Sequence, residues 1–202
     1  MNLLHPRRRN FLQLALSSIG TAIFAGLPKI GLPETRNDIY SPETRSDDKG
    51  FIVREEEGIH LLTGRRKMPI NIKLSKEKHG LSDVSFCVEH IAPGRKMRIH
   101  KHLNNDEIIF IHKGQGTVTL DETTHEVNTG DLVYVPRGVW HGLDNTGQEE
   151  IKMVFQYTPA GFEQYFIENG TLEGKAAKER TPEEYAATEK KYGMLYKDNV
   201  LN

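Results

Sequence analysis

Two stretches of this chain determine the prediction of its fold. Residues 94–114 have the sequence GRKMRIHKHLNNDEIIFIHKG, and residues 130–145 have the sequence GDLVYVPRGVWHGLDN. In both, short apolar runs rich in β-branched residues are separated by Gly, Pro and Asn, which is typical of strands joined by tight turns. Similar runs occur at residues 84–91, 117–120 and 151–157. Short strands at this spacing predict an all-β protein, an antiparallel sandwich or barrel.

The same two stretches contain three histidines and one glutamate at a spacing that suits a metal site. Side chains alternate between the two faces of a strand, so His100 and His102 are expected on the same side. Glu107 begins the next predicted strand after a short turn, and His141 follows the turn at residues 136–138. Imidazole and carboxylate ligands suit one divalent transition metal, Fe, Mn, Ni, Cu or Zn, and ligand type alone does not choose among them.

Both stretches resemble the two motifs of the cupin superfamily, Gly94-x5-His100-x-His102-x4-Glu107-x6-Gly114 and Gly130-x5-Pro136-x-Gly138-x2-His141-x3-Asn145. The segment from about Ser82 to Tyr157 looks like a single cupin domain. The resemblance implies an antiparallel jelly-roll barrel with the metal inside. The ligands that it implies are His100, His102, Glu107 and His141.

The tail of the chain adds a second, less specific resemblance. Residues 158–163, TPAGFE, and residues 191–193, KYG, are similar to the tail of bacterial single-domain cupins grouped with quercetin dioxygenase-like proteins. This resemblance implies a metal-dependent, dioxygenase-like oxidoreductase that acts on a small phenolic or enolic compound. It also implies that Glu107 serves as a catalytic base as well as a ligand.

Two other classes of function remain open at the level of the sequence. The metal could act purely as a Lewis acid in an isomerase, cyclase or lyase, which zinc would favour because it has no redox chemistry. The chain could also bind a small molecule without turnover. Loss of a metal ligand would indicate such a binding protein, and none of the four ligands is lost here.

The N-terminal segment has the features of an export signal. Residues 8–13, RRNFLQ, resemble a twin-arginine signal, and residues 10–28 form a short, uncharged and moderately apolar run. We expect a signal peptide over residues 1–25, a flexible lead-in over residues 26–49, and a periplasmic or exported protein. The alternative is an uncleaved membrane anchor, which the shortness of the apolar run disfavours.

The pattern after the last predicted strand changes to a helical period. We expect the barrel domain over residues 50–158 and a helical segment over residues 159–202. Aromatic residues three and four apart predict a helix over residues 159–168, with Thr158 able to cap it. A capping box at residues 181–184 begins a second helix. These helices are expected outside the barrel or against a second subunit.

Composition excludes several classes of protein. The net charge is −1 and basic residues form few clusters, so nucleic acid is not an expected partner. The single cysteine, Cys87, excludes an intrachain disulfide and is predicted to be a small buried hydrophobic residue. We expect a small-molecule substrate, no stable membrane association after signal removal, and a homodimer. Tyr134 and Trp140 are predicted either to pack in the core or to contact the substrate.

Overall fold

The computed structural model describes residues 49–64, 67–177 and 179–197. The predicted signal over residues 1–25 lies outside the described residues, as does all but the last residue of the predicted lead-in. Within the described part of the chain, no helix is both long enough and apolar enough to cross a membrane.

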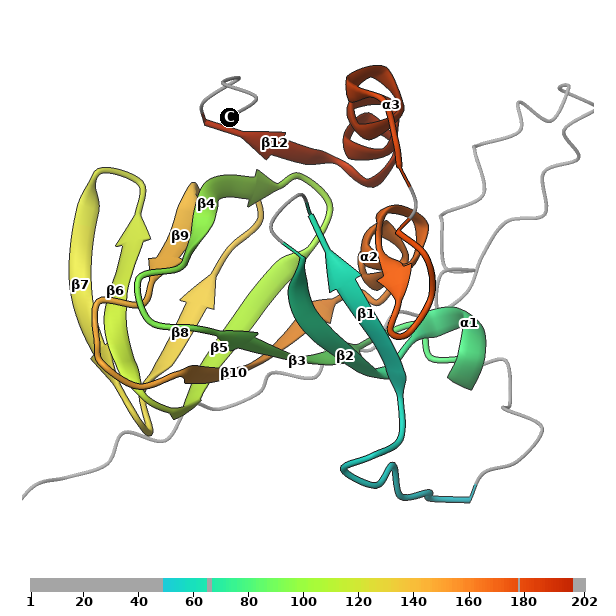
Figure 1. The fold of residues 1–202 in the computed structure, drawn as a ribbon, viewed down its shortest axis with the longest axis horizontal. Helices are drawn as coiled ribbons and strands as arrows, with labels where there is room; N and C mark the ends of the chain where they lie inside the picture. The colour runs from blue at the N-terminus through green and yellow to red at the C-terminus, as the bar shows by residue number, and fades with distance from the viewer. Residues whose placement is uncertain (1–48, 65–66, 178, 198–202) are drawn as a thin grey trace, which may run out of the picture. The chain divides into compact units, whose positions relative to one another are not determined.

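Two antiparallel sheets make up the fold (Figure 1). The larger sheet has seven strands, in the order β11 (Thr171–Leu172), β1 (Ile59–Thr63), β2 (Met68–Leu74), β3 (Ser85–Ile91), β10 (Ile151–Thr158), β5 (Asp106–Lys113) and β8 (Leu132–Val135). The smaller sheet has five strands, in the order β12 (Met194–Tyr196), β4 (Lys96–His102), β9 (His141–Asp144), β6 (Gln115–Leu120) and β7 (Thr123–Asn128). The predicted all-β jelly-roll fold is confirmed.

The core lies between the two sheets and is built from alternate residues of each strand. In β10 these are Ile151, Met153, Phe155 and Tyr157, all fully or almost fully buried. Phe155 pairs with Cys87 of β3 on one side and with Ile109 of β5 on the other. Burying each large apolar side chain contributes roughly 1.5–3 kcal/mol, so this stack supplies much of the stability of the larger sheet. Cys87 is completely buried, as predicted.

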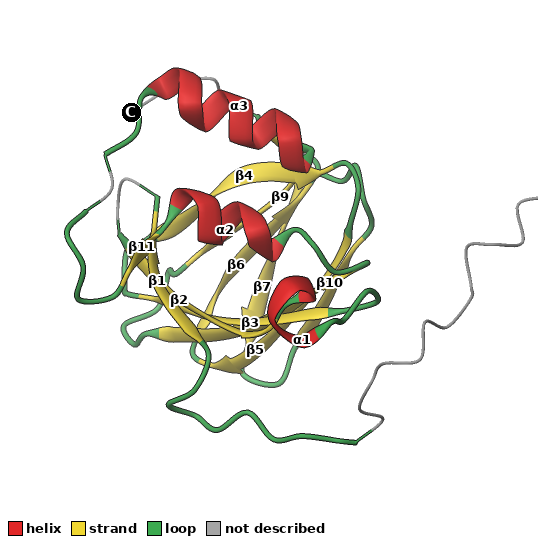
Figure 2. Ribbon diagram, turned by 90° about the vertical axis from the view of Figure 1, so that its right-hand side faces the viewer, coloured by secondary structure: helices red, strands yellow, loops and turns green. Residues whose placement is uncertain are grey.

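The helices lie outside the two sheets, as Figure 2 shows. The helix α3 (Pro182–Tyr192) begins at the predicted capping box: the Glu184 N–H donates to Thr181 Oγ1, and the Thr181 N–H donates to the Glu184 carboxylate. It ends at Gly193, whose φ of 68° is the left-handed conformation that favours glycine. A further short helix, α1 (Lys76–His79), was not predicted.

The helix α2 (Glu163–Asn169) begins later than predicted, and the prediction that Thr158 caps it is wrong. Thr158 is the last residue of β10 and pairs with Asp106 of β5, so its backbone is extended within the sheet and cannot begin a helix. Phe162 precedes the helix without a capping side chain. The buried carboxylate of Glu163 instead accepts hydrogen bonds from the backbone N–H groups of Lys76 and Gly161.

The short strand β12 extends the smaller sheet next to the predicted metal ligands. Tyr196 pairs with His100 of β4, and Met194 pairs with His102. The sequence did not predict this strand, because three residues after a helix are too few to show a strand period. Its consequence is that the C-terminal segment borders the region where the histidines lie.

Candidate metal centre

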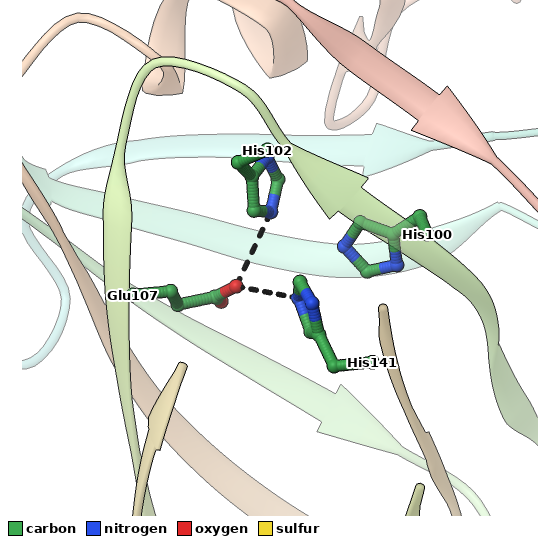
Figure 3. Close-up of side chains that lie close together, drawn as sticks. All are labelled: His100, His102, Glu107 and His141. Carbon is green, nitrogen blue, oxygen red and sulfur yellow. Dashed lines mark hydrogen bonds and ion pairs between the residues drawn. The ribbon is translucent and has the colours of Figure 1, made fainter. Parts of the chain in front are cut away.

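The structure brings the four predicted metal ligands into one cluster (Figure 3). His100 and His102 come from β4, Glu107 comes from β5, and His141 is the first residue of β9. One potential ligand atom from each residue lies within 4.8 Å of the others, and all four side chains are buried. The cluster therefore draws its four donors from three strands in the interior of the barrel, and it is compatible with one divalent metal.

Backbone pairing fixes the positions of these side chains. His100 and His102 share the inward face of β4, and His100 pairs directly with His141 across the β4–β9 ladder. In the turn before β9, the Gly138 N–H donates to the carbonyl oxygen of His102 at 2.7 Å. Sites built on strands are held more precisely than sites built on loops, so this arrangement is preorganised for a ligand.

A salt bridge holds the same turn next to Glu107. The Arg137 guanidinium lies 3.0 Å from the Asp106 carboxylate, and the backbone N–H of Arg137 donates to the same oxygen at 2.9 Å. The hydrogen bonds from Arg137 lower the pKa of Asp106. Because Asp106 precedes Glu107 in β5, this contact anchors the start of the strand that carries the carboxylate ligand.

Hydrogen bonds to the backbone orient two of the imidazoles. We assign His100 Nδ1–H as donor to the carbonyl of Arg98, at 2.7 Å, and His141 Nδ1–H as donor to the carbonyl of Val139, at 3.1 Å. Donation from Nδ1 turns the Nε2 lone pair toward the cluster, the usual arrangement of a histidine ligand.

His102 provides the clearest test of whether a metal fits. Both of its ring nitrogens are buried without a hydrogen-bond partner among the described residues, although Nε2 lies 3.2 Å from Glu107 Oε2. Buried polar atoms in native proteins nearly always have a partner. A metal ion between the imidazoles and the carboxylate would supply that partner, so the residues present fit such an ion.

The charges of the cluster also suit a cation. Burial, and then the neighbouring histidines, lower the pKa of His100 well below its ordinary value, so its imidazole is neutral and its lone pair is available. Burial opposes ionisation of Glu107, but its contacts with His102 and His141 prevail and lower its pKa. Burial also acts against protonation of His141, yet the Glu107 carboxylate, 2.8 Å away, raises the pKa of His141. A metal would replace the proton that His141 and Glu107 share.

Aromatic side chains surround the cluster. The His102 ring packs edge-on against Phe162, with centroids 4.1 Å apart, and against Tyr157 at 5.0 Å. Tyr196 of β12 lies 6.0 Å from His100, and the Arg98 guanidinium stacks 4.1 Å from the Tyr196 ring centroid. These rings exclude bulk water from two sides of the imidazoles, which strengthens electrostatic interactions inside the site.

The other residues considered from the sequence lie elsewhere. Tyr134 is on the outer face of β8 and 55% exposed, so it belongs neither to the core nor to the cluster. Trp140 is partly exposed, with the Lys101 ammonium 4.4 Å from its ring centroid. His90 pairs with Glu150 at 2.7 Å, between two partly exposed side chains.

Sequence reasoning missed one residue of the barrel interior, Glu89. It lies on the inward face of β3, between Cys87 and Ile91, and only 7% of its surface is exposed. Burial, and then the negative charge of Glu107, raise the pKa of Glu89 to about 8. The available signal was positional: Glu89 has the same parity in its strand as two apolar residues that the alternating pattern assigns to the core.

Comparison with known proteins identifies the segment that carries the cluster. The family model of the cupin domain matches residues 87–157, which include all four predicted ligands. This segment is therefore similar to a cupin domain. The match agrees with the jelly-roll fold and with the first resemblance seen in the sequence.

Two curated relatives match this chain over part of its length. An uncharacterised protein of Methanocaldococcus jannaschii is 39% identical over 67 residues, which are 33% of this chain and 54% of that protein. The dimethylsulfoniopropionate lyase DddW of Ruegeria pomeroyi is 28% identical over 81 residues, which are 40% of this chain and 52% of the lyase. The chain thus spans about half the length of these two relatives.

Among solved structures, a predicted oxalate decarboxylase from Thermotoga maritima is similar to this chain. The sequence identity is 23%, the TM-score is 0.49, and the alignment covers 54% of this chain and 99% of the other. The alignment is therefore complete for that smaller protein and leaves much of the present chain outside it.

Proposed function

We propose that this protein is a metal-dependent cupin enzyme with dioxygenase-like activity on a small phenolic or enolic compound. The observation that carries the proposal is the buried cluster of three imidazoles and one carboxylate. Four protein ligands leave one or two positions open on a metal that prefers five or six, and an open position is what a catalytic metal requires. When bound, a redox-active metal would supply electron transfer and hold a substrate oxygen.

In this proposal Glu107 accepts a proton as well as ligating the metal. A hydroxyl group near a divalent cation becomes a much stronger acid, because the cation stabilises its conjugate base. A carboxylate whose pKa is lowered, as that of Glu107 is, can therefore still take the proton of such a hydroxyl. His100 and His141, oriented by their bonds to the backbone, hold the site in place during the transfer.

A lyase, isomerase or cyclase that uses the metal only as a Lewis acid is the second candidate. The observation that favours it is the 28% identity to a dimethylsulfoniopropionate lyase, which extends over 81 residues. Such chemistry needs the same open metal position and the same general base, but no dioxygen. Zinc in the purified protein would favour this candidate over the first.

The proposal includes export and assembly. We infer from the twin-arginine-like residues 8–13 that the chain is exported after folding, so that the metal is chosen in the cytoplasm. Outside, the Irving–Williams order would favour copper or zinc whatever the site requires. A signal-less protein, folded without metal in periplasm-like medium, should then acquire a different metal from the exported one. We also propose a homodimer, which sedimentation of the metal-loaded chain tests.

The decisive experiment combines metal content with oxygen uptake. The exported protein is purified without added metal, its elements are measured, and oxygen consumption is followed with phenols and enols as substrates. Iron, manganese, nickel or copper together with substrate-dependent oxygen uptake supports the proposal. Product formation from such compounds without oxygen uptake would replace it with the second candidate. The matched control is His102→Ala, which should lack both metal and activity.

A further inference from the structure

Glu89 is a carboxyl group in an apolar part of the barrel interior. It lies on the inward face of β3, and its partners across the two neighbouring ladders are Ile70 and Met153, both buried apolar residues. Carboxyl groups are rarely this buried unless they are paired, because burial removes the water that stabilises their charge. The burial of this carboxyl group in an apolar environment therefore requires an explanation.

In the part of the chain that the structure describes, no protein group pairs with this carboxyl. Among the described residues, Glu89 has no ion-pair partner and its side chain has no hydrogen bond. Its carboxyl oxygens are also not among the fully enclosed polar atoms, a group that includes both ring nitrogens of His102. Together with the remaining 7% exposure, this leaves the oxygens within reach of a small molecule.

Glu89 shares the interior with the metal cluster without belonging to it. It is not one of the four residues whose ligand atoms lie within 4.8 Å of one another. Yet Glu89 pairs with Met153 of β10, the strand whose Tyr157 ring lies 5.0 Å from the His102 ring. The Glu89 carboxyl and Tyr157 thus both point into the interior between the two sheets, where Tyr157 borders His102.

We propose that Glu89 contacts the substrate, its carboxyl group hydrogen-bonding to a hydroxyl or carbonyl oxygen other than the oxygen held at the metal. The proposal rests on the proposed function in one respect, that the substrate is an oxygen compound bound at the cluster. It narrows the substrate class to compounds with a second oxygen function, such as dihydroxylated aromatic rings or hydroxylated enols.

The protonation state of Glu89 supports this role. With a pKa raised to about 8 by burial and by Glu107, the carboxyl is largely neutral at pH 7 and can both donate and accept a hydrogen bond. A neutral acid also avoids repulsion from an enolate or phenolate. A glutamine at this position would keep the size, the neutrality and both hydrogen-bonding capacities, which provides a conservative variant.

The test compares four probes that differ only in their second oxygen. Calorimetry measures the binding of phenol, catechol, resorcinol and hydroquinone to the metal-loaded full chain and to its Glu89→Leu and Glu89→Gln variants. For at least one dihydroxybenzene, we expect the ratio of its Kd to the Kd of phenol to be about tenfold higher in Glu89→Leu than in the wild type. In Glu89→Gln the same ratio should stay close to the wild-type value. All three proteins should hold the same equivalents of metal.

Two results would overturn the inference: unchanged affinities relative to phenol in Glu89→Leu, or no binding of any dihydroxybenzene to the loaded wild type. The fate of the proposed dioxygenase activity is measured separately, by oxygen uptake. A protein that consumes no oxygen, but whose dihydroxybenzene affinity depends on Glu89, would lose the proposed function and keep this inference. A purely structural role predicts instead that Glu89→Leu lowers the melting temperature of the metal-free protein, which our account excludes.

Discussion

The two buried carboxyl groups of the barrel interior, Glu107 and Glu89, differ in their partners and therefore in their charge. Glu107 has two histidines within 3.2 Å, and its pKa is lowered. Among the residues that the structure describes, Glu89 has no such partner, and burial, followed by the charge of Glu107, raises its pKa to about 8. Burial is common to both, so the partners decide which group is ionised. One residue is thereby suited to hold a cation and the other to meet a neutral or anionic ligand.

The largest expected effect comes from removing the paired carboxylate. Glu107→Leu should abolish stoichiometric metal binding, and it should destabilise the metal-free protein by about 3–5 kcal/mol because it leaves buried histidine without its counter-charge. Elemental analysis and urea unfolding measure the two effects. Unchanged metal content would contradict the assignment of Glu107 as a ligand, whatever happens to stability.

The two carboxyl groups should contribute to the pH dependence of stability with opposite signs. A group whose pKa is raised on folding binds its proton more tightly in the folded state, so stability is lost as pH rises from its unfolded value toward its folded value. For Glu89 that window is about pH 4.5 to 8. For Glu107 the pKa is lowered, so its contribution is present at neutral pH and is lost on acidification.

Comparison of the wild type with a variant that cannot titrate at this position isolates the contribution of Glu89 to the pH dependence of stability. Between pH 6 and pH 9 the metal-free wild type should lose about 2–3 kcal/mol of stability relative to Glu89→Gln, which cannot titrate. Equal pH profiles for the two proteins would mean that Glu89 is not held protonated by its surroundings.

Replacing the unpaired carboxyl should have the opposite sign from replacing the paired one. Glu89→Leu places an apolar side chain among Ile70 and Met153, and at pH 7.5 it should stabilise the metal-free protein by about 1–3 kcal/mol. Metal content should stay at the wild-type value. A loss of stability in both Glu89→Leu and Glu107→Leu would remove the distinction between the two residues.

The smallest effect is expected for a control residue that is not part of the cluster. Thr181→Ala removes the side-chain cap of α3 and should cost about 1 kcal/mol of stability without changing metal content or probe binding. If Thr181→Ala also lost metal, then the loss in other variants would reflect general destabilisation rather than removal of a ligand.

The cluster of three histidines and one glutamate was predictable because the spacing of its residues determines their direction. His100 and His102 are two apart in a strand, and the turns before Glu107 and His141 return the chain to the same region, so a local pattern was enough to predict a cluster. The capping box at residues 181–184 was also predictable from a local sequence pattern, and the structure contains it.

The parts that the sequence did not predict depend on contacts between distant segments. Thr158 has a capping side chain, yet pairing with Asp106 keeps it in β10, so tertiary structure overrides the local preference. β12 is defined only by its partner β4. The isolation of Glu89 follows from what surrounds it in three dimensions, and alternation within β3 shows only which face it occupies.

The most direct test of the central claim is elemental analysis of the purified wild type beside His102→Ala, with circular dichroism to confirm that both are folded. His102 is the informative position because neither ring nitrogen has a hydrogen-bond partner among the described residues. The account predicts about one equivalent of a transition metal in the wild type and little or none in the folded variant. A folded His102→Ala protein that retains the wild-type metal content would contradict it.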